Sequence, residues 1–200
     1  MFGEAPSART DLRPGTLYAI ASPNRSVFYG QVCADQSFAF YRVRDPELSE
    51  FEPSASTSVM SRFSVNLPSI GRALRAGVWK KIGKADLVDK LQEDNSYVQW
   101  PVGTLNVHVW RGPSIVSNTR IEDPAIQNTE VMIVWDADAH VARRLLVDFD
   151  YQGALHANTS AWSIGGPVWR QRRVREEYAR RFPGEPHDLP KDWVPTNSPG

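Results

Sequence analysis

Three short β-rich segments near the N-terminus constrain the fold of this chain more than any other feature. They are residues 15–21 (GTLYAIA), 27–34 (VFYGQVCA) and 38–43 (FAFYRV), and turn-forming residues such as SPNR at 22–25 separate them. Short strands joined by turns pair in sequence order, so the sequence predicts an antiparallel meander. Gly30 lies inside the second segment and indicates a bulge or a sharp bend, which would curl a small sheet toward a barrel.

Later segments extend the sheet and add helices. In LNVHVW at 105–110, apolar and polar residues alternate, as is typical of a half-buried strand. Helices are expected from Asp136 or Asp138 through about Asp148, and from Pro167 to Phe182. The predicted fold is α+β and mostly β, a curled antiparallel sheet or small, partly open barrel with two C-terminal helices. The other expected elements are a short helix at 68–77 and strands at 58–66, 78–83, 97–100 and 130–135.

The sequence predicts one domain with an appendage at each end. Residues 1–14 are mostly small or polar and are expected to form a flexible leader. Residues 15–182 are expected to form a single domain, which agrees with the 200-residue length of the chain. Residues 183–200 hold five of the 15 prolines and are expected to form an extended or disordered tail.

The charges of the chain balance in total but are unevenly distributed. There are 23 Lys and Arg residues against 23 Asp and Glu residues, which argues against a surface built as a whole for nucleic acid or anionic membrane. Six Arg and two Glu give residues 170–181 a charge of +4. Elsewhere, an acidic run holds Asp45, Glu47, Glu50 and Glu52, and a basic run holds Arg72, Arg75, Lys80, Lys81 and Lys84.

Few residues of the chain are suited to hold a metal ion or to act as a nucleophile. Cys33 is the single cysteine and lies in an apolar run, which favours an inert core thiol. The four histidines lack metal-binding spacing, so we expect neither metal nor cofactor. Because no apolar segment suits a secretory signal or a membrane span, we expect a soluble, cytoplasmic protein with no membrane partner.

Two functional alternatives follow from charged residues. The pairs Glu122/Asp123, Asp136/Asp138 and Asp148/Asp150 could serve a small hydrolase or a sugar-active enzyme, if one pair lay in a cleft at strand ends. The Arg-rich helix at 167–182 also carries aromatic residues and could form a module that binds nucleic acid. Its arginines fit the solvated face of an amphipathic helix better than a nucleic-acid surface, so nucleic acid is not the expected partner.

Three short motifs resemble those of the immunity protein 26 family of bacterial polymorphic-toxin systems. The opening GTLYAIA matches at Gly15, Tyr18, Ala19 and Ile20. The second strand matches at Tyr29, Gly30 and Val32, and VWKKIG matches at Trp79, Ile82 and Gly83. The resemblance covers residues 13–90, and it departs from the family at Ala21, where a proline is usual, and at Gln31, where a basic residue is usual.

This resemblance implies a non-enzymatic protein that binds and neutralises a cognate toxin in the cytoplasm. It implies no catalytic residue, and its motif residues are expected to be scaffold: Gly15, Tyr18, Ile20, Gly30, Trp79, Ile82 and Gly83. Because toxins that attack nucleic acid often have basic clefts, one hypothesis is that Asp45, Glu47, Glu50 and Glu52 form part of the surface that faces the toxin. The alternative is a solvated loop without a partner. Trp110, on the polar face of its strand, is a further candidate contact because exposed tryptophans anchor interfaces.

Overall fold

Each of the two sheets in the structure belongs to a separate unit of the chain. The structure is a computed structural model that describes residues 1–150, 165–184 and 189–196. The first unit comprises Met1–Asn95 and Val134–Tyr151, and the second comprises Ser96–Ile133 and Gln152–Gly200. The sequence predicts one domain over residues 15–182. In the structure, the chain leaves the first unit after Asn95 and returns to it at Val134.

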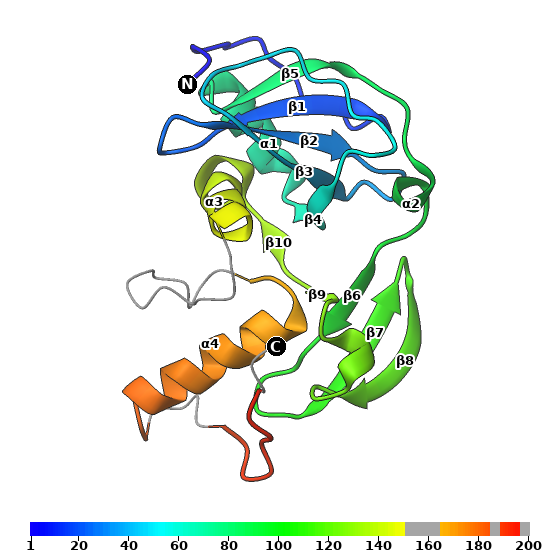
Figure 1. The fold of residues 1–200 in the computed structure, drawn as a ribbon, viewed down its shortest axis with the longest axis vertical. Coiled ribbons are helices and arrows are strands. Elements are labelled where there is room, and N and C mark those ends of the chain that lie inside the picture. Colours follow the sequence, from blue (N-terminus) through cyan, green and yellow to red (C-terminus); the bar gives the residue numbers. More distant parts are fainter. Residues whose placement is uncertain (151–164, 185–188, 197–200) are drawn as a thin grey trace. The chain divides into compact units, whose positions relative to one another are not determined.

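The first unit is built on a six-stranded sheet with the order β10-β4-β3-β2-β1-β5 (Figure 1). Strands β1 to β4 form the expected antiparallel meander, β5 pairs with β1, and β10 runs parallel to β4. The sheet curls into a half-barrel, so the predicted mostly-β, α+β class is confirmed. The strands are β1 (Thr16–Ala21), β2 (Val27–Val32), β3 (Phe38–Asp45), β4 (Val59–Val65), β5 (Trp79–Lys84) and β10 (Val134–Trp135).

Aromatic side chains form the core on one face of this sheet. The rings of Tyr18, Phe38 and Phe40 lie 5.6, 5.6 and 6.4 Å from the ring of Trp79. Phe63 stacks on Phe40 at 4.6 Å, and all five side chains are buried. Such ring pairs stabilise a core beyond the apolar area that they bury, so this cluster holds β1, β3, β4 and β5 together.

Gly30 allows the sheet to bend at this aromatic cluster. The register between β2 and β3 shifts between Phe28 and Gly30, which confirms the predicted bulge. A Cβ atom at position 30 would lie 2.9 Å from the Phe40 ring, closer than side chains normally pack. The absence of a side chain therefore lets Phe40 lie directly on β2.

Three helical segments accompany the sheet, together with the short helix α2 (Asp89–Gln92). Helix α1 (Leu67–Arg75) contacts β5 and buries Ile70, Ala73 and Leu74. The π-helix η2 (Ala137–Val141) leads into α3 (Ala142–Asp150), in agreement with the helix expected over this stretch. The expected cap is wrong, because the Asp136 side chain bonds to Asn66 (2.7 Å) rather than to the helix backbone.

The N-terminal segment is hydrogen-bonded to the first unit. The backbone N–H of Phe2 donates to Gly77 O at 2.8 Å, and that of Ala5 donates to Arg75 O at 3.0 Å. Asp11 accepts from Lys81 at 2.5 Å, and its backbone N–H donates to the Tyr18 hydroxyl. Residues 1–14, expected as a flexible leader, thus have defined partners on α1, β1 and β5.

The second unit contains a four-stranded sheet with the order β8-β7-β6-β9. The sequence did not predict β8, because SIVSNTR lacks a regular apolar alternation. The expected single strand at 130–135 is also wrong, since its two halves pair in different sheets as β9 and β10. The elements are β6 (Ser96–Gln99), β7 (Asn106–Arg111), β8 (Ser114–Arg120), η1 (Pro124–Ile126), β9 (Glu130–Val131) and α4 (Val168–Arg181).

The core of the second unit confirms the alternation predicted for 105–110. Leu105, Val107 and Val109 are buried, whereas Asn106 is exposed and Trp110 is half-buried. Residues 189–196 of the proline-rich tail also contribute, because Trp193 stacks on Trp100 with the ring centres 5.9 Å apart. The remaining tail residues 185–188 and 197–200 lie outside the described residues.

We predict that Gly30→Ala destabilises the chain by about 1–3 kcal/mol, because the new methyl group overlaps the Phe40 ring. Gly71→Ala is the matched control. Its Cβ would meet only the mobile end of Arg75 and the Thr10 hydroxyl at 3.3 and 3.4 Å, and it removes a glycine from α1. Urea unfolding of both variants measures the difference. Equal stability of the two variants would contradict the role of Gly30.

Candidate functional site

The acidic loop, defined as residues 45–52, is fastened to the sheet of the first unit. Asp45 Oδ2 accepts hydrogen bonds from the Tyr29 hydroxyl at 2.7 Å and from Ser49 Oγ at 2.5 Å. The Phe51 ring stacks on the Tyr29 ring with a centroid distance of 4.3 Å and an interplanar angle of 14°. The two ends of the loop are therefore held over the same strand, β2.

The sheet face beneath the acidic loop forms a second apolar cluster. Leu17, Ala19, Val27, Tyr29 and Tyr41 are buried there, and Leu48 and Phe51 of the loop pack against them. The Tyr41 hydroxyl donates to Oε1 of the buried Gln31, whose amide nitrogen donates to Ala85 O at 2.9 Å. Burial raises the pKa of Tyr29 and of Tyr41, so both hydroxyls stay protonated and can donate hydrogen bonds.

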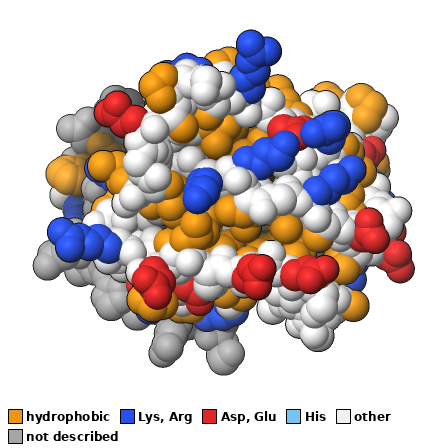
Figure 2. Space-filling model, turned by 90° about the horizontal axis from the view of Figure 1, so that it is seen from above, with side chains coloured by type: hydrophobic (Ala, Val, Ile, Leu, Met, Phe, Trp, Pro, Cys, Tyr) orange, Lys and Arg blue, Asp and Glu red, His pale blue; other side chains and the backbone are white. Residues whose placement is uncertain are grey.

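The geometry separates the four acidic residues into two groups. Asp45 is half-buried and fixes the loop, whereas Glu47, Glu50 and Glu52 are exposed. Figure 2 shows a row of acidic side chains along one border of the face that is seen from above, with hydrophobic side chains next to that row. Three carboxylates on a fastened loop form an anionic edge that can meet a cationic partner without first ordering the loop.

The basic residues between 72 and 84 do not all contribute charge to the surface in the same way, because two of them form ion pairs. Arg72 pairs with Asp138 at 2.7 Å, and Lys81 pairs with Asp11 at 2.5 Å. Arg75, Lys80 and Lys84 are exposed. The run therefore divides between residues that hold the N-terminal segment or η2 and residues that contribute positive charge to the surface.

Trp110 belongs to the second unit, whereas the acidic loop belongs to the first. Its ring is half-buried on β7, and its Nε1–H donates to Gln99 Oε1 at 2.9 Å. Tyr97 on β6 and the exposed Ile115 on β8 are its direct neighbours across the strands. The structure thus places the two candidate contact sites in different units.

The motif residues expected to be scaffold fall into three groups. Tyr18, Ile20 and Trp79 are fully buried in the aromatic core. Ile82 is half-buried and packs on the cluster beneath the acidic loop. Gly15 has a φ of +91°, and a Cβ there would lie 2.5 Å from Ala85 O, so this position favours glycine. Gly30 forms the bulge, and Gly83 is a half-buried residue of β5.

Members of all three carboxylate pairs are held in contacts with other parts of the chain. Four of them form ion pairs: Glu122 with Arg120, Asp138 with Arg72, Asp148 with Arg144 and Asp150 with Arg44. Asp123 caps η1 by accepting a hydrogen bond from the backbone N–H of Ala125. A cleft of 340 Å³ beside α1 and β5 is lined by one carboxylate, that of Glu4. Glycoside hydrolysis canonically uses two convergent carboxylates, so the alternative of an enzyme that uses paired carboxylates gains no support from these contacts.

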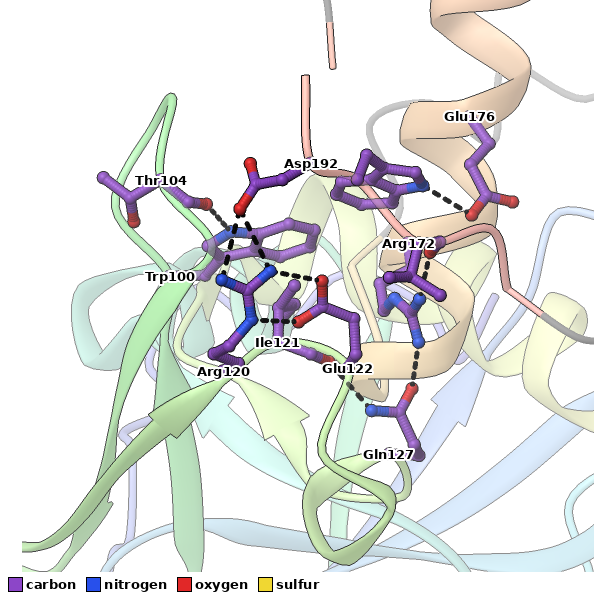
Figure 3. Close-up of polar contacts among 11 residues, drawn as sticks. Trp100, Thr104, Arg120, Ile121, Glu122, Gln127, Arg172, Glu176 and Asp192 are labelled. Carbon is purple, nitrogen blue, oxygen red and sulfur yellow. Dashed lines mark hydrogen bonds and ion pairs between the residues drawn. The ribbon is translucent and has the colours of Figure 1, made fainter. Parts of the chain in front are cut away.

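The six arginines of α4 divide between the interior of the second unit and its surface. Arg170 and Arg172 are only 4% and 5% exposed, so these two do not lie on the solvated face expected for the arginines of this helix. Arg180 and Arg181 are exposed and pair with Glu177, as expected for that face. Arg172 donates to Gln127 Oε1 and to Val194 O (Figure 3). The Arg175 guanidinium lies 3.5 Å from the centre of the Trp100 ring, where loss of hydration lowers its pKa. These contacts weaken the alternative of a nucleic-acid module.

Cys33 and the possible metal-binding side chains are the remaining groups that could carry chemistry. Cys33 is buried, and burial raises the pKa of its thiol, which agrees with an unreactive core residue. Within residues 1–150, 165–184 and 189–196, no three His, Cys, Asp or Glu side chains gather as a metal site. None of the helices described over those ranges has the length and apolar character needed to cross a membrane.

No family model, curated protein or solved structure matches this chain. The resemblance to the immunity protein 26 family therefore depends on the motif residues themselves, which lie on β1, β2 and β5 of the first unit. The family and its function stay predictions.

We predict that Phe51→Ala loosens the acidic loop. The substitution removes the ring stacked on Tyr29 and should lower stability by about 1–3 kcal/mol, because Phe51 is half-buried. Limited proteolysis should then cut within residues 45–58 faster than in the unmodified chain. Glu47→Ala, at an exposed position of the same loop, should leave the cleavage rate unchanged. An unaltered rate in Phe51→Ala would show that the stack does not hold the loop.

Proposed function

We propose that this chain is an immunity protein that binds a cognate bacterial toxin and neutralises it in the cytoplasm of the cell that makes both. The acidic loop is the proposed contact with the toxin, and no catalytic step by the immunity protein is part of the proposal. The observation that carries it is the fastening of the loop by Asp45 and Phe51, which leaves Glu47, Glu50 and Glu52 exposed.

Rigidity supports this assignment. An inhibitor that must bind tightly loses less conformational entropy when its contact loop is already ordered. The Tyr29 hydrogen bond and the Phe51 stack hold the loop at both ends, and Leu48 packs beneath its middle. The three glutamates therefore start from a backbone that is positioned for binding.

Charge also supports the assignment. A toxin that acts on nucleic acid needs a cationic surface, and a row of carboxylates both accelerates encounter with such a surface and competes for it. The apolar side chains beside the loop, including half-buried Leu48 and Phe51, supply the desolvated contact that a charged rim alone lacks. Together they match the usual interface arrangement of an apolar centre with a charged border.

The product of the neighbouring gene is the partner to test, because toxin and immunity genes of such systems are adjacent. We expect its C-terminal domain to co-purify with this chain and to lose its toxicity when this chain is co-expressed. If the purified neighbour neither binds nor is neutralised, the proposed function is wrong.

We predict that the triple variant Glu47→Lys/Glu50→Lys/Glu52→Lys lowers affinity for that toxin at least about tenfold, about 1.4 kcal/mol. The loss should be greatest at low ionic strength and should appear mainly in the association rate, because exposed charges act through long-range attraction. Stopped-flow or surface-based kinetics in a salt series measure both.

The matched control is Asp89→Lys/Glu93→Lys/Asp94→Lys. These three residues are exposed acids of the same unit, and their reversal changes the net charge by the same amount. The control should bind as the unmodified chain does, apart from a small general effect of net charge. Equal losses in both triple variants would show that total charge, rather than the acidic loop, governs binding.

A further inference from the structure

The two sheets have four edges, and three of them are protected against pairing with another strand. Strand β5 carries Lys80, Lys81 and Lys84, and an edge rich in lysine repels a second strand. Strand β10 has only two residues. Strand β9 is equally short, and its outer side is covered, because Val131 N donates to Gly166 O and Glu130 pairs with Pro167.

Strand β8 is the fourth edge and has none of these protections. It has seven residues and lies at the outer border of its sheet (Figure 1). It contains neither lysine nor proline, and Arg120 at its end is its single charged residue. In the described part of the chain, no strand pairs with its outer side. A long uncharged edge of this kind pairs readily with an added strand.

Most side chains of β8 are exposed to solvent. Six of its seven residues are exposed, and Ile115 and Val116 are 47% and 52% exposed. The register with β7 shifts between Val109 and Trp110, so β8 carries one bulge, at Val116, between residues 114–115 and 117–120, which pair regularly with β7. Ile115 lies opposite the half-buried Trp110, which adds apolar surface next to the edge.

We propose that β8 pairs with β8 of a second copy of this chain, in antiparallel orientation, to form a dimer with a continuous sheet across the two copies. The composition of the strand favours its own copy as the occupant. Ser, Ile, Val, Ser, Asn and Thr at 114–119 offer no charge that would select a charged peptide. A second copy supplies an edge of equal length and neutrality, and a two-fold arrangement covers both edges at once.

Electrostatics select the antiparallel orientation. In a parallel pair the two Arg120 residues would lie on neighbouring strands about 4.8 Å apart, and like charges in that position are destabilising. In an antiparallel pair they lie toward opposite ends of a seven-residue strand, up to about 20 Å apart. Each Arg120 is also paired with Glu122 and Asp192 of its own chain, at 3.0 and 3.2 Å (Figure 3).

Sedimentation equilibrium over a micromolar to submillimolar concentration series tests the proposal. We expect the mass to rise from 22.5 kDa toward twice that value. In the dimer, amide hydrogen exchange should slow in β8 but not in β5, which locates the contact. A chain that stays monomeric over the whole series, or protection confined to another strand, would overturn the proposal.

We predict that Val116→Lys weakens dimerisation at least about tenfold, because it places a positive charge on each of the two edges that must meet. Val102→Lys is the matched control, since Val102 is 80% exposed in the connection between β6 and β7. The control should dimerise normally, and circular dichroism should show both variants folded. An equal effect of both lysines would contradict the assignment. So would a Val116→Lys variant that dimerises normally but loses toxin binding, because β8 would then pair with the toxin.

Discussion

The packing of aromatic rings around Trp79 is the interaction on which the first unit depends. Trp79 lies on β5, at the end of the sheet order, whereas Phe40 lies on β3, near its middle. Their rings are 6.4 Å apart at an interplanar angle of 84°, a contact that a flat sheet of this order would not allow. The bulge at Gly30 and the ring of Phe40 placed directly on it provide the required curvature.

The alternation of side chains along β2 connects this core to the proposed contact surface. Gly30 faces the aromatic core, and Tyr29 before it faces the opposite side. Tyr29 is therefore held in position by the core while its ring and hydroxyl hold the acidic loop. The sheet thereby holds the acidic loop at both of its ends.

The balanced net charge of the sequence does not describe the surface, because several arginines are used in contacts inside the structure. Many arginines serve internal contacts: Arg144 lies 4.0 Å from the Phe63 ring centre, and Arg172 and Arg175 lie over the rings of Trp193 and Trp100. Among the charges that remain exposed, glutamates lie on the acidic loop and lysines lie on β5. Those lysines also keep the β5 edge from pairing, whereas β8 has no such charge.

The sequence by itself determined the elements whose signals are local. Period-two alternation and turn residues predicted β1 to β5 and β7, and Gly30 predicted the bulge. Apolar spacing and prolines at helix starts predicted α1, α3 and α4, because each signal depends on neighbours within a few residues. Only the tertiary structure decided which of the four acidic residues hold the loop and which are exposed. It also decided that residues 130–135 divide between two sheets, that α4 buries two arginines, and that β8 is an unprotected edge. These features depend on contacts between residues far apart in the sequence, such as Tyr29 with Asp45 and Gln127 with Arg172. Local residue patterns do not identify such contacts.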